Sequence, residues 1–218
     1  MGFKKTLKKI PLRQIKIETL VFGRIVNKYR FPLPIIKDFN KAYEKEKKNL
    51  LSYGPKLAGR LDTELSIIPI IEKTEAMSYL VTCMDDYIQS LMKHNCLPIK
   101  KYHCNILAAW VNDMVAGEYN PPHIHHNGTG YSTVLFLKIP KFINDAKDPH
   151  KFKDGNLGFI DVDGIGTTYK EPEIGDFYIF PANHQHLVLP FKTKKKNDIR
   201  RSMSFNFIVE EKDAKQLS

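Results

Sequence analysis

The sequence predicts a mainly β (α+β) fold, in which helices near the N-terminus brace a barrel or a two-sheet sandwich. Apolar residues recur at helical spacing twice within residues 35–94, whereas after residue 101 short apolar runs alternate with Gly, Pro and Asn. Several short strands in succession are typical of barrels and sandwiches. We therefore expect a single structural domain, with residues 1–100 as an N-terminal α+β section that packs on the barrel, residues 101–210 as its core and residues 211–218 as a C-terminal tail.

In the first hundred residues, we expect one strand and two helices. Residues 15–26 are rich in β-branched and apolar side chains, which predicts a strand interrupted by Gly23. Helices are predicted over residues 35–51 and about 72–94, and Pro98 ends the second one.

The second half predicts a series of short strands. These are Asn105–Met114, Tyr131–Leu137, Gly158–Val162, Asp176–Phe180, His186–Pro190 and Ser202–Val209. Residues 141–156 form a long polar connection, and loops of this length are usually functional or disordered. We expect this connection to be a lid over the substrate side.

The composition is that of a globular protein, with 218 residues, 42% hydrophobic and 27% charged. No apolar run approaches the about 18 residues of a membrane span, and no apolar segment follows the lysines of residues 1–10, so neither a membrane partner nor a secretory signal is expected. Cys83, Cys96 and Cys104 are odd in number and not closely paired, which favours a reducing, cytoplasmic compartment.

The formal net charge of +10 gathers in three basic clusters. They comprise Lys4, Lys5, Lys8 and Lys9, then residues 45–48, then residues 192–201. Such clusters could attract nucleic acid or an acidic protein. Because no aromatic residues are interleaved with them, a solvated surface is the favoured interpretation and nucleic acid is not the favoured partner.

Five of the eight histidines fall in two short clusters. Side chains alternate along a strand, so His123 and His125 share a face, and so do His184 and His186. A lone histidine would more often bind only water or backbone. Two clusters 61 residues apart (186 − 125) on predicted barrel strands favour a metal site. Spacing alone does not decide which member of the second cluster points inward.

A basic pair, Arg200-Arg201, precedes the last predicted strand. Arg200 and Ser202 are alternate residues, so both can point into the barrel, where a buried arginine requires an anion. A dicarboxylate would satisfy the guanidinium through two hydrogen bonds, and the Ser202 hydroxyl would add a third. Arg201 is expected to point outward and to continue the basic cluster before it.

Several short motifs occur in order between residues 57 and 209. They are Leu57-Ala58-Gly59, Trp110-Val111-Asn112, residues 117–121, His123-Ile124-His125, residues 131–137, residues 155–159, residues 175–181, His186 and residues 200–206. In this order and spacing, they resemble the 2-oxoglutarate- and Fe(II)-dependent oxygenases, most closely the prolyl-hydroxylase-like oxygenases of marine bacteria and their phages.

The resemblance implies a double-stranded β-helix, or jelly-roll, that holds one Fe(II) ion and uses 2-oxoglutarate and O2. It makes His123 and His186 metal ligands, and it places the far carboxylate of 2-oxoglutarate on Arg200 and Ser202. Most of the superfamily has Asp or Glu two residues after the first histidine, where this chain has His125.

The third ligand is thus His125 or a carboxylate, for which Asp161, Asp163 and Asp176 are near in sequence but do not match the motif position. Tyr131 or Thr133 is expected to donate a hydrogen bond to the cosubstrate.

The implied activity is a dioxygenase (hydroxylase) that oxidises a substrate C–H bond and releases succinate and CO2. A prolyl or other residue of a protein is the first expectation for the substrate, in the host cytoplasm if a phage encodes the chain. The alternative is a cupin-like metal-binding protein without 2-oxoglutarate chemistry, which would lack the pair of Arg200 and Ser202. A non-catalytic binding module is a third interpretation.

Overall fold

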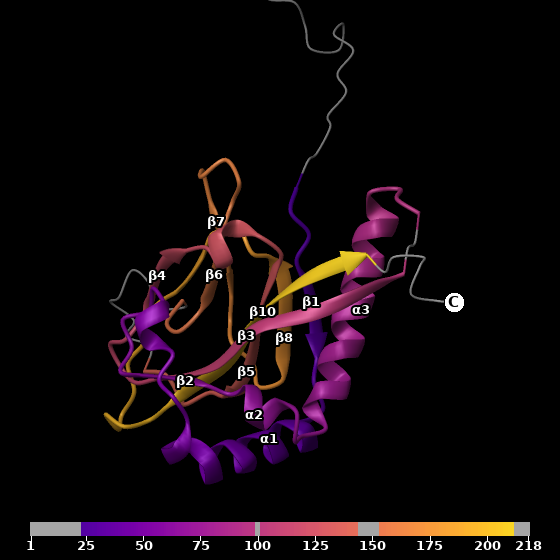
Figure 1. Ribbon diagram of the computed structural model, residues 1–218. Coiled ribbons are helices and arrows are strands. Elements are labelled where there is room, and N and C mark those ends of the chain that lie inside the picture. Colours follow the sequence, from indigo (N-terminus) through magenta and orange to yellow (C-terminus); the bar gives the residue numbers. More distant parts are fainter. Residues whose placement is uncertain (1–22, 99–100, 144–152, 212–218) are drawn as a thin grey trace, which may run out of the picture.

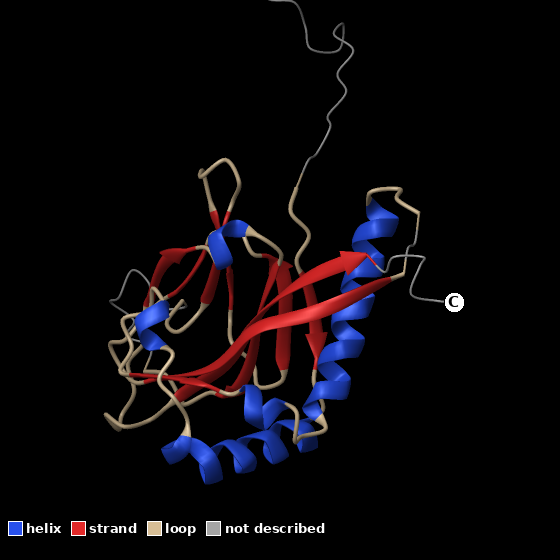
Figure 2. Cartoon of the chain, in the orientation of Figure 1, coloured by secondary structure: helices blue, strands red, loops and turns tan. Residues whose placement is uncertain are grey.

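Two antiparallel sheets form the body of the protein in the computed structural model, which describes residues 23–98, 101–143 and 153–211 (Figures 1 and 2). In these residues the larger sheet has the strand order β1-β8-β5-β10-β3-β2 and the smaller has the order β4-β9-β6-β7. The larger sheet consists of β1 (Asn27–Arg30), β8 (Asp176–Pro181), β5 (Tyr131–Lys138), β10 (Arg200–Glu211), β3 (Tyr102–Met114) and β2 (Thr63–Ser66). The smaller consists of β4 (Asn120–His123), β9 (His186–Val188), β6 (Leu157–Ile160) and β7 (Thr167–Lys170).

Strands that pair in these sheets are mostly distant in the sequence. β10 lies between β3 and β5, and β9 lies between β4 and β6. This interleaving of early and late strands in two facing sheets is the jelly-roll arrangement, and it confirms the predicted fold class.

The helices pack on the outer face of the larger sheet (Figure 1). They are α1 (Leu33–Glu46), α2 (Ile68–Ile71) and α3 (Ala76–His94), with short 3-10 turns at η2 (Lys47–Asn49), η3 (Gly54–Lys56) and η4 (His126–Gly128). Pro34 lies in the first turn of α1, where its missing N–H costs no hydrogen bond. No helix in the described residues is long and apolar enough to cross a membrane.

The predictions of helices and strands are most accurate where the apolar pattern extends over many residues. The two long helices were expected, although α1 ends at Glu46 and continues only as a 3-10 turn. The strand predicted over residues 15–26 was wrong for residues 23–26, which are not strand, and the rest of it lies outside the described residues. β1, β2 and β7 were not predicted, and the strand expected to carry His123 and His125 is β4, which ends at His123. The proposed lid lies largely outside the described residues, as does the basic cluster near the N-terminus, and the domain boundaries stay predictions.

Side chains alternate between the two faces of the larger sheet, so its apolar residues belong to two separate hydrophobic cores. Leu135, Met203 and Phe205 point to the helices and pack with the apolar residues of α1 and α3. Val134 and Phe136 point the other way and pack with the smaller sheet. Both faces of the larger sheet are therefore covered, and the inner face lies toward the space between the sheets.

Arg201 is the main correction to the sequence prediction, because its side chain is only 1% exposed. It points out of the barrel as expected, but α1 covers it. Its Nε and Nη2 donate to the Asp113 carboxylate at 2.5 and 3.0 Å, and Nη2 also donates to Glu44 Oε1 of α1 at 2.6 Å. Lys47 Nζ lies 2.6 Å from Asp113 Oδ2. Although burial alone would raise the pKa of Asp113, the hydrogen bonds from Arg201 and Lys47 lower it.

We expect the variant Arg201→Ala to lose about 3 to 5 kcal/mol of unfolding free energy in urea titrations, because it leaves the Asp113 charge buried without its main partner. The control is the double variant Arg201→Met with Asp113→Leu, which fills the same space with apolar atoms and should recover most of the loss. Equal losses in the single and double variants would contradict the ion-pair interpretation.

Candidate active site

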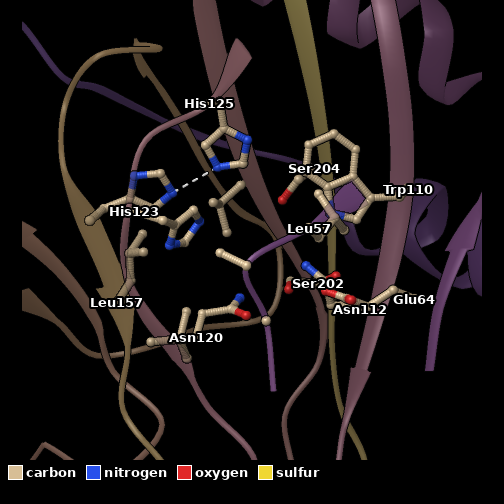
Figure 3. Close-up of a pocket in the computed structure, with 15 residues that line it drawn as sticks. Leu57, Glu64, Trp110, Asn112, Asn120, His123, His125, Leu157, Ser202 and Ser204 are labelled. Atoms are coloured by element: carbon tan, nitrogen blue, oxygen red, sulfur yellow. Dashed lines mark hydrogen bonds between the residues drawn. The ribbon is translucent and has the colours of Figure 1, made fainter. Parts of the chain in front are cut away.

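Three histidines converge between the sheets. His123 ends β4, and His125 lies two residues later in a bend. His186 begins β9 opposite His123 in the strand register. Their ligand nitrogens all lie within 4.8 Å of one another, and Nε2 of His125 is 3.0 Å from Nε2 of His186 (Figure 3). The two histidine clusters of the sequence therefore meet, and His186 is the member of the second cluster that joins the group.

Backbone carbonyls orient two of the three rings. His123 Nδ1 lies 2.7 Å from the Pro121 carbonyl oxygen, and His186 Nδ1 lies 2.9 Å from that of His184. A carbonyl only accepts, so each Nδ1 carries the proton and each Nε2 keeps its lone pair. This is the usual arrangement behind metal-binding histidines.

The environment keeps the imidazoles neutral. Burial lowers the pKa of His123. Burial, followed by repulsion from His123, lowers the pKa of His125 to about 3. Burial and both neighbouring histidines lower the pKa of His186 well below its ordinary value. Neutral imidazoles are the form that binds a metal, so no proton has to be displaced near neutral pH.

The donor set fits a divalent transition metal such as Fe(II). Two nitrogens held about 2.1 Å from one cation and at right angles lie about 3.0 Å apart, which is the Nε2–Nε2 separation between His125 and His186. In the described part of the chain, no carboxylate joins this group. Asp176 instead pairs with Lys28 and Arg30 on the larger sheet.

The histidines line a pocket whose other wall is the inner face of the larger sheet (Figure 3). Its lining also includes Leu57, Gly59, Glu64, Trp110, Asn112, Asn120, Val134, Leu157, Ser202 and Ser204. Trp110 stacks on His125 with a centroid distance of 5.5 Å and on Tyr53 at 5.3 Å. Trp110 is buried, and it also forms a wall of the pocket.

Arg200 is completely buried and only partly paired. Its Nε donates to the Gly155 carbonyl at 3.0 Å, and its guanidinium carbon lies 4.9 Å from the centre of the Phe136 ring. Its Nη2 has no hydrogen-bond partner among the described residues. Burial lowers the pKa of Arg200 to about 9. A buried guanidinium with Nη2 free, beside Ser202, which lines the pocket, is suited to bind a carboxylate.

Tyr131 and Thr133 lie on the opposite face of the larger sheet, which differs from the expectation. Tyr131 packs on Tyr87 and Phe207 in the core beneath the helices. The Thr133 hydroxyl donates to the Phe205 carbonyl at 3.1 Å. The inward residue of β5 at this level is Val134, so neither Tyr131 nor Thr133 reaches the pocket.

Four polar residues of the pocket were not predicted as site residues: Glu64, Asn112, Asn120 and Ser204. Glu64 lies on the short edge strand β2, in a stretch without a clear periodic pattern. Asn112 and Asn120 lie in β3 and β4. Alternation with Trp110, two residues earlier, is the one sequence signal that could have placed Asn112 on the inner face.

The family comparison agrees with this geometry. Residues 108–206 match the family model described as "Putative 2OG-Fe(II) oxygenase", a stretch that contains the three histidines, Arg200 and Ser202. The matched stretch is 99 of the 218 residues, and it agrees with the family resemblance that the motifs indicated. No match was found among curated protein sequences.

Several solved structures share the fold. A Pseudomonas putida prolyl-4-hydroxylase is 17% identical with a TM-score of 0.55, over 85% of this chain and 92% of that chain. A viral collagen prolyl hydroxylase from Paramecium Bursaria Chlorella virus-1, solved as a 2OG complex, is 14% identical with a TM-score of 0.56, over 84% and 94%. A prolyl hydroxylase from Trichoplax adhaerens, in complex with a hypoxia inducible factor peptide fragment, is 13% identical with a TM-score of 0.55, over 85% and 83%. At these identities the likeness shows the fold alone.

We expect the stability difference between the variant Glu64→Gln and the wild type to depend on pH. Burial, followed by repulsion from Glu118, raises the pKa of Glu64 from 4.5 to about 7. Between these values, the folded protein holds a proton that the unfolded chain has released, so the wild type loses stability as pH rises through this window.

The variant should gain about 2 kcal/mol relative to the wild type between about pH 5 and about pH 8, measured by urea unfolding. Glu171→Gln removes an exposed carboxylate and should show no such trend. A Glu64→Gln difference that stays flat with pH would show that the carboxyl titrates normally.

Proposed function

We propose that the chain is an Fe(II)- and 2-oxoglutarate-dependent dioxygenase that hydroxylates a C–H bond and releases succinate and CO2. One observation carries the proposal: three neutral imidazoles converge in the pocket that Ser202 lines, and beside Ser202 on the same face of β10 lies Arg200, with Nη2 unpaired. The match of residues 108–206 to the oxygenase family model supports this chemistry for the arrangement.

His123, His125 and His186 would hold the ferrous ion through Nε2. The carbonyl contacts of the first and last rings fix their direction before the metal arrives. The chemistry supplied by Fe(II) with 2-oxoglutarate is oxidative decarboxylation of the oxoacid by O2, coupled to insertion of one oxygen atom into a substrate C–H bond. Buried walls such as Leu157 and Trp110 exclude water from this reaction.

Arg200 and Ser202 would bind the far carboxylate of 2-oxoglutarate. The free Nη2 and the hydroxyl lie on alternate residues of one strand, so both can contact one anion. The same pair separates this proposal from the cupin-like alternative, and the family match also favours the oxygenase.

For the substrate, we propose a prolyl or other residue of a protein or peptide. The support is that three of the structural neighbours are prolyl hydroxylases, one of them solved with a peptide. The cytoplasmic location and the relation to phages and marine bacteria stay predictions.

We expect Fe(II) added without oxygen to give a visible charge-transfer absorption band only together with 2-oxoglutarate, and succinate to form once O2 is admitted. The variant His186→Ala should bind Fe(II) at least about tenfold more weakly, because one of three ligands is lost. His94→Ala, which removes an exposed histidine at the end of α3, is the control and should bind as the wild type does. Unchanged Fe(II) affinity in His186→Ala would exclude the three-histidine site.

We expect Arg200→Ala to weaken 2-oxoglutarate binding about 100-fold, equivalent to about 3 kcal/mol, with a much smaller effect on Fe(II). Anaerobic titration of the absorption band measures both affinities. Lys170→Ala removes an exposed cation of β7 and should leave both unchanged. Wild-type affinity for 2-oxoglutarate in Arg200→Ala would remove the main support for the cosubstrate.

A further inference from the structure

Polar side chains cross the pocket side of the larger sheet in one row. Glu64 of β2 pairs in register with Asn112 of β3, which pairs with Ser202 of β10. Residues opposite each other in register point to the same face, so all three side chains line the pocket. Figure 3 shows this group on one side of the pocket and His123 and His125 on the other.

This end of the pocket is rich in hydrogen-bond acceptors that lack donors. Asn112 Oδ1 and Asn120 Oδ1 are buried without a partner among the described residues. No hydrogen bond or ion pair to the Glu64 carboxyl is found in that part of the chain either, although Glu64 is only 4% exposed. A buried acceptor without a donor costs free energy, and a buried carboxylate without a cation costs more. Glu64, Asn112 and Asn120 therefore fit a ligand that donates hydrogen bonds.

The space around these acceptors is confined. A Cβ atom at Gly59 would lie 2.5 Å from Asn120 Oδ1 and 2.7 Å from Glu64 Oε1. Both oxygens thus occupy the space that a side chain at position 59 would fill, and a bulky planar cation has little room there. The elevated pKa of Glu64 agrees with a carboxyl that lacks a counter-charge, because burial raises it to about 7.

We propose that Glu64, Asn112 and Asn120 form a subsite for a primary ammonium group of the substrate. An ammonium group has three N–H donors, no acceptor and a compact shape, which matches three acceptors in a confined space. An anion would be repelled by Glu64, and a hydroxyl group would satisfy only one of the three oxygens. The inference rests on the proposed function only in taking this ligand to be part of the substrate.

The test uses the one tryptophan of the chain, Trp110, as a reporter, because its indole lines the pocket. Trp110 fluorescence is titrated at about pH 8 with n-pentylammonium and with 1-pentanol, a neutral probe of equal length. The chelator-treated full chain is used, so that the result does not depend on iron binding. We expect n-pentylammonium to bind the wild type about tenfold or more tightly than 1-pentanol, because a charge-assisted hydrogen bond is gained.

The variant Glu64→Gln keeps the size of the side chain and should reduce this preference to within about twofold. The matched control is Glu118→Gln, which removes the neighbouring carboxylate; Glu118 accepts hydrogen bonds from the Asp62 and Val115 backbone N–H groups and does not line the pocket. It should keep the preference.

Equal affinity of the wild type for the two probes would overturn the subsite, and so would a full preference in Glu64→Gln. The absorption band of Fe(II) with 2-oxoglutarate is recorded separately. A wild type that forms the band but does not prefer the ammonium probe would overturn the subsite and leave the proposed activity standing.

Discussion

The structure depends on the buried ion pair between Arg201 and Asp113. The two residues are opposite each other in the register of β10 and β3, and their bonds cross the outer face of the larger sheet. A shift of one residue would move every side chain of β10 to the other face and would leave both charges unpaired. The pair therefore fixes the register of the two central strands and, through Glu44, attaches α1 to them.

That register decides what faces the pocket. With Arg201 held on the helix side, alternation directs Arg200, Ser202 and Ser204 inward from β10. With Asp113 held on the same side, Asn112 and Trp110 point inward from β3. The ion pair and the polar groups of the pocket are thus two consequences of one pairing, although they lie on opposite faces of the sheet.

The alternation of side chains along a strand correctly predicted which residues share a face. It did not predict which face of a buried strand points to the pocket. His123 and His125 were placed together correctly because both belong to one short motif. Tyr131 and Thr133 were placed on the wrong face because β5 is buried on both sides, so its apolar pattern does not distinguish pocket from helix. The burial of Arg201 under α1 depends on tertiary packing, which the local sequence around Arg201 does not indicate. Glu64 lies on an edge strand of four residues, too short to show a period.

Two imidazoles of the site contact the main-chain oxygen of the residue two positions earlier. His123 contacts that of Pro121, and His186 contacts that of His184. The support comes from the path of the backbone and not from the side chains at these positions. The contacts to the two rings therefore do not depend on which side chains stand at 121 and 184, provided the backbone keeps its course. A relative with a different amino acid at position 184 could keep an intact centre, so identity at that position is a poor guide to which relatives are active.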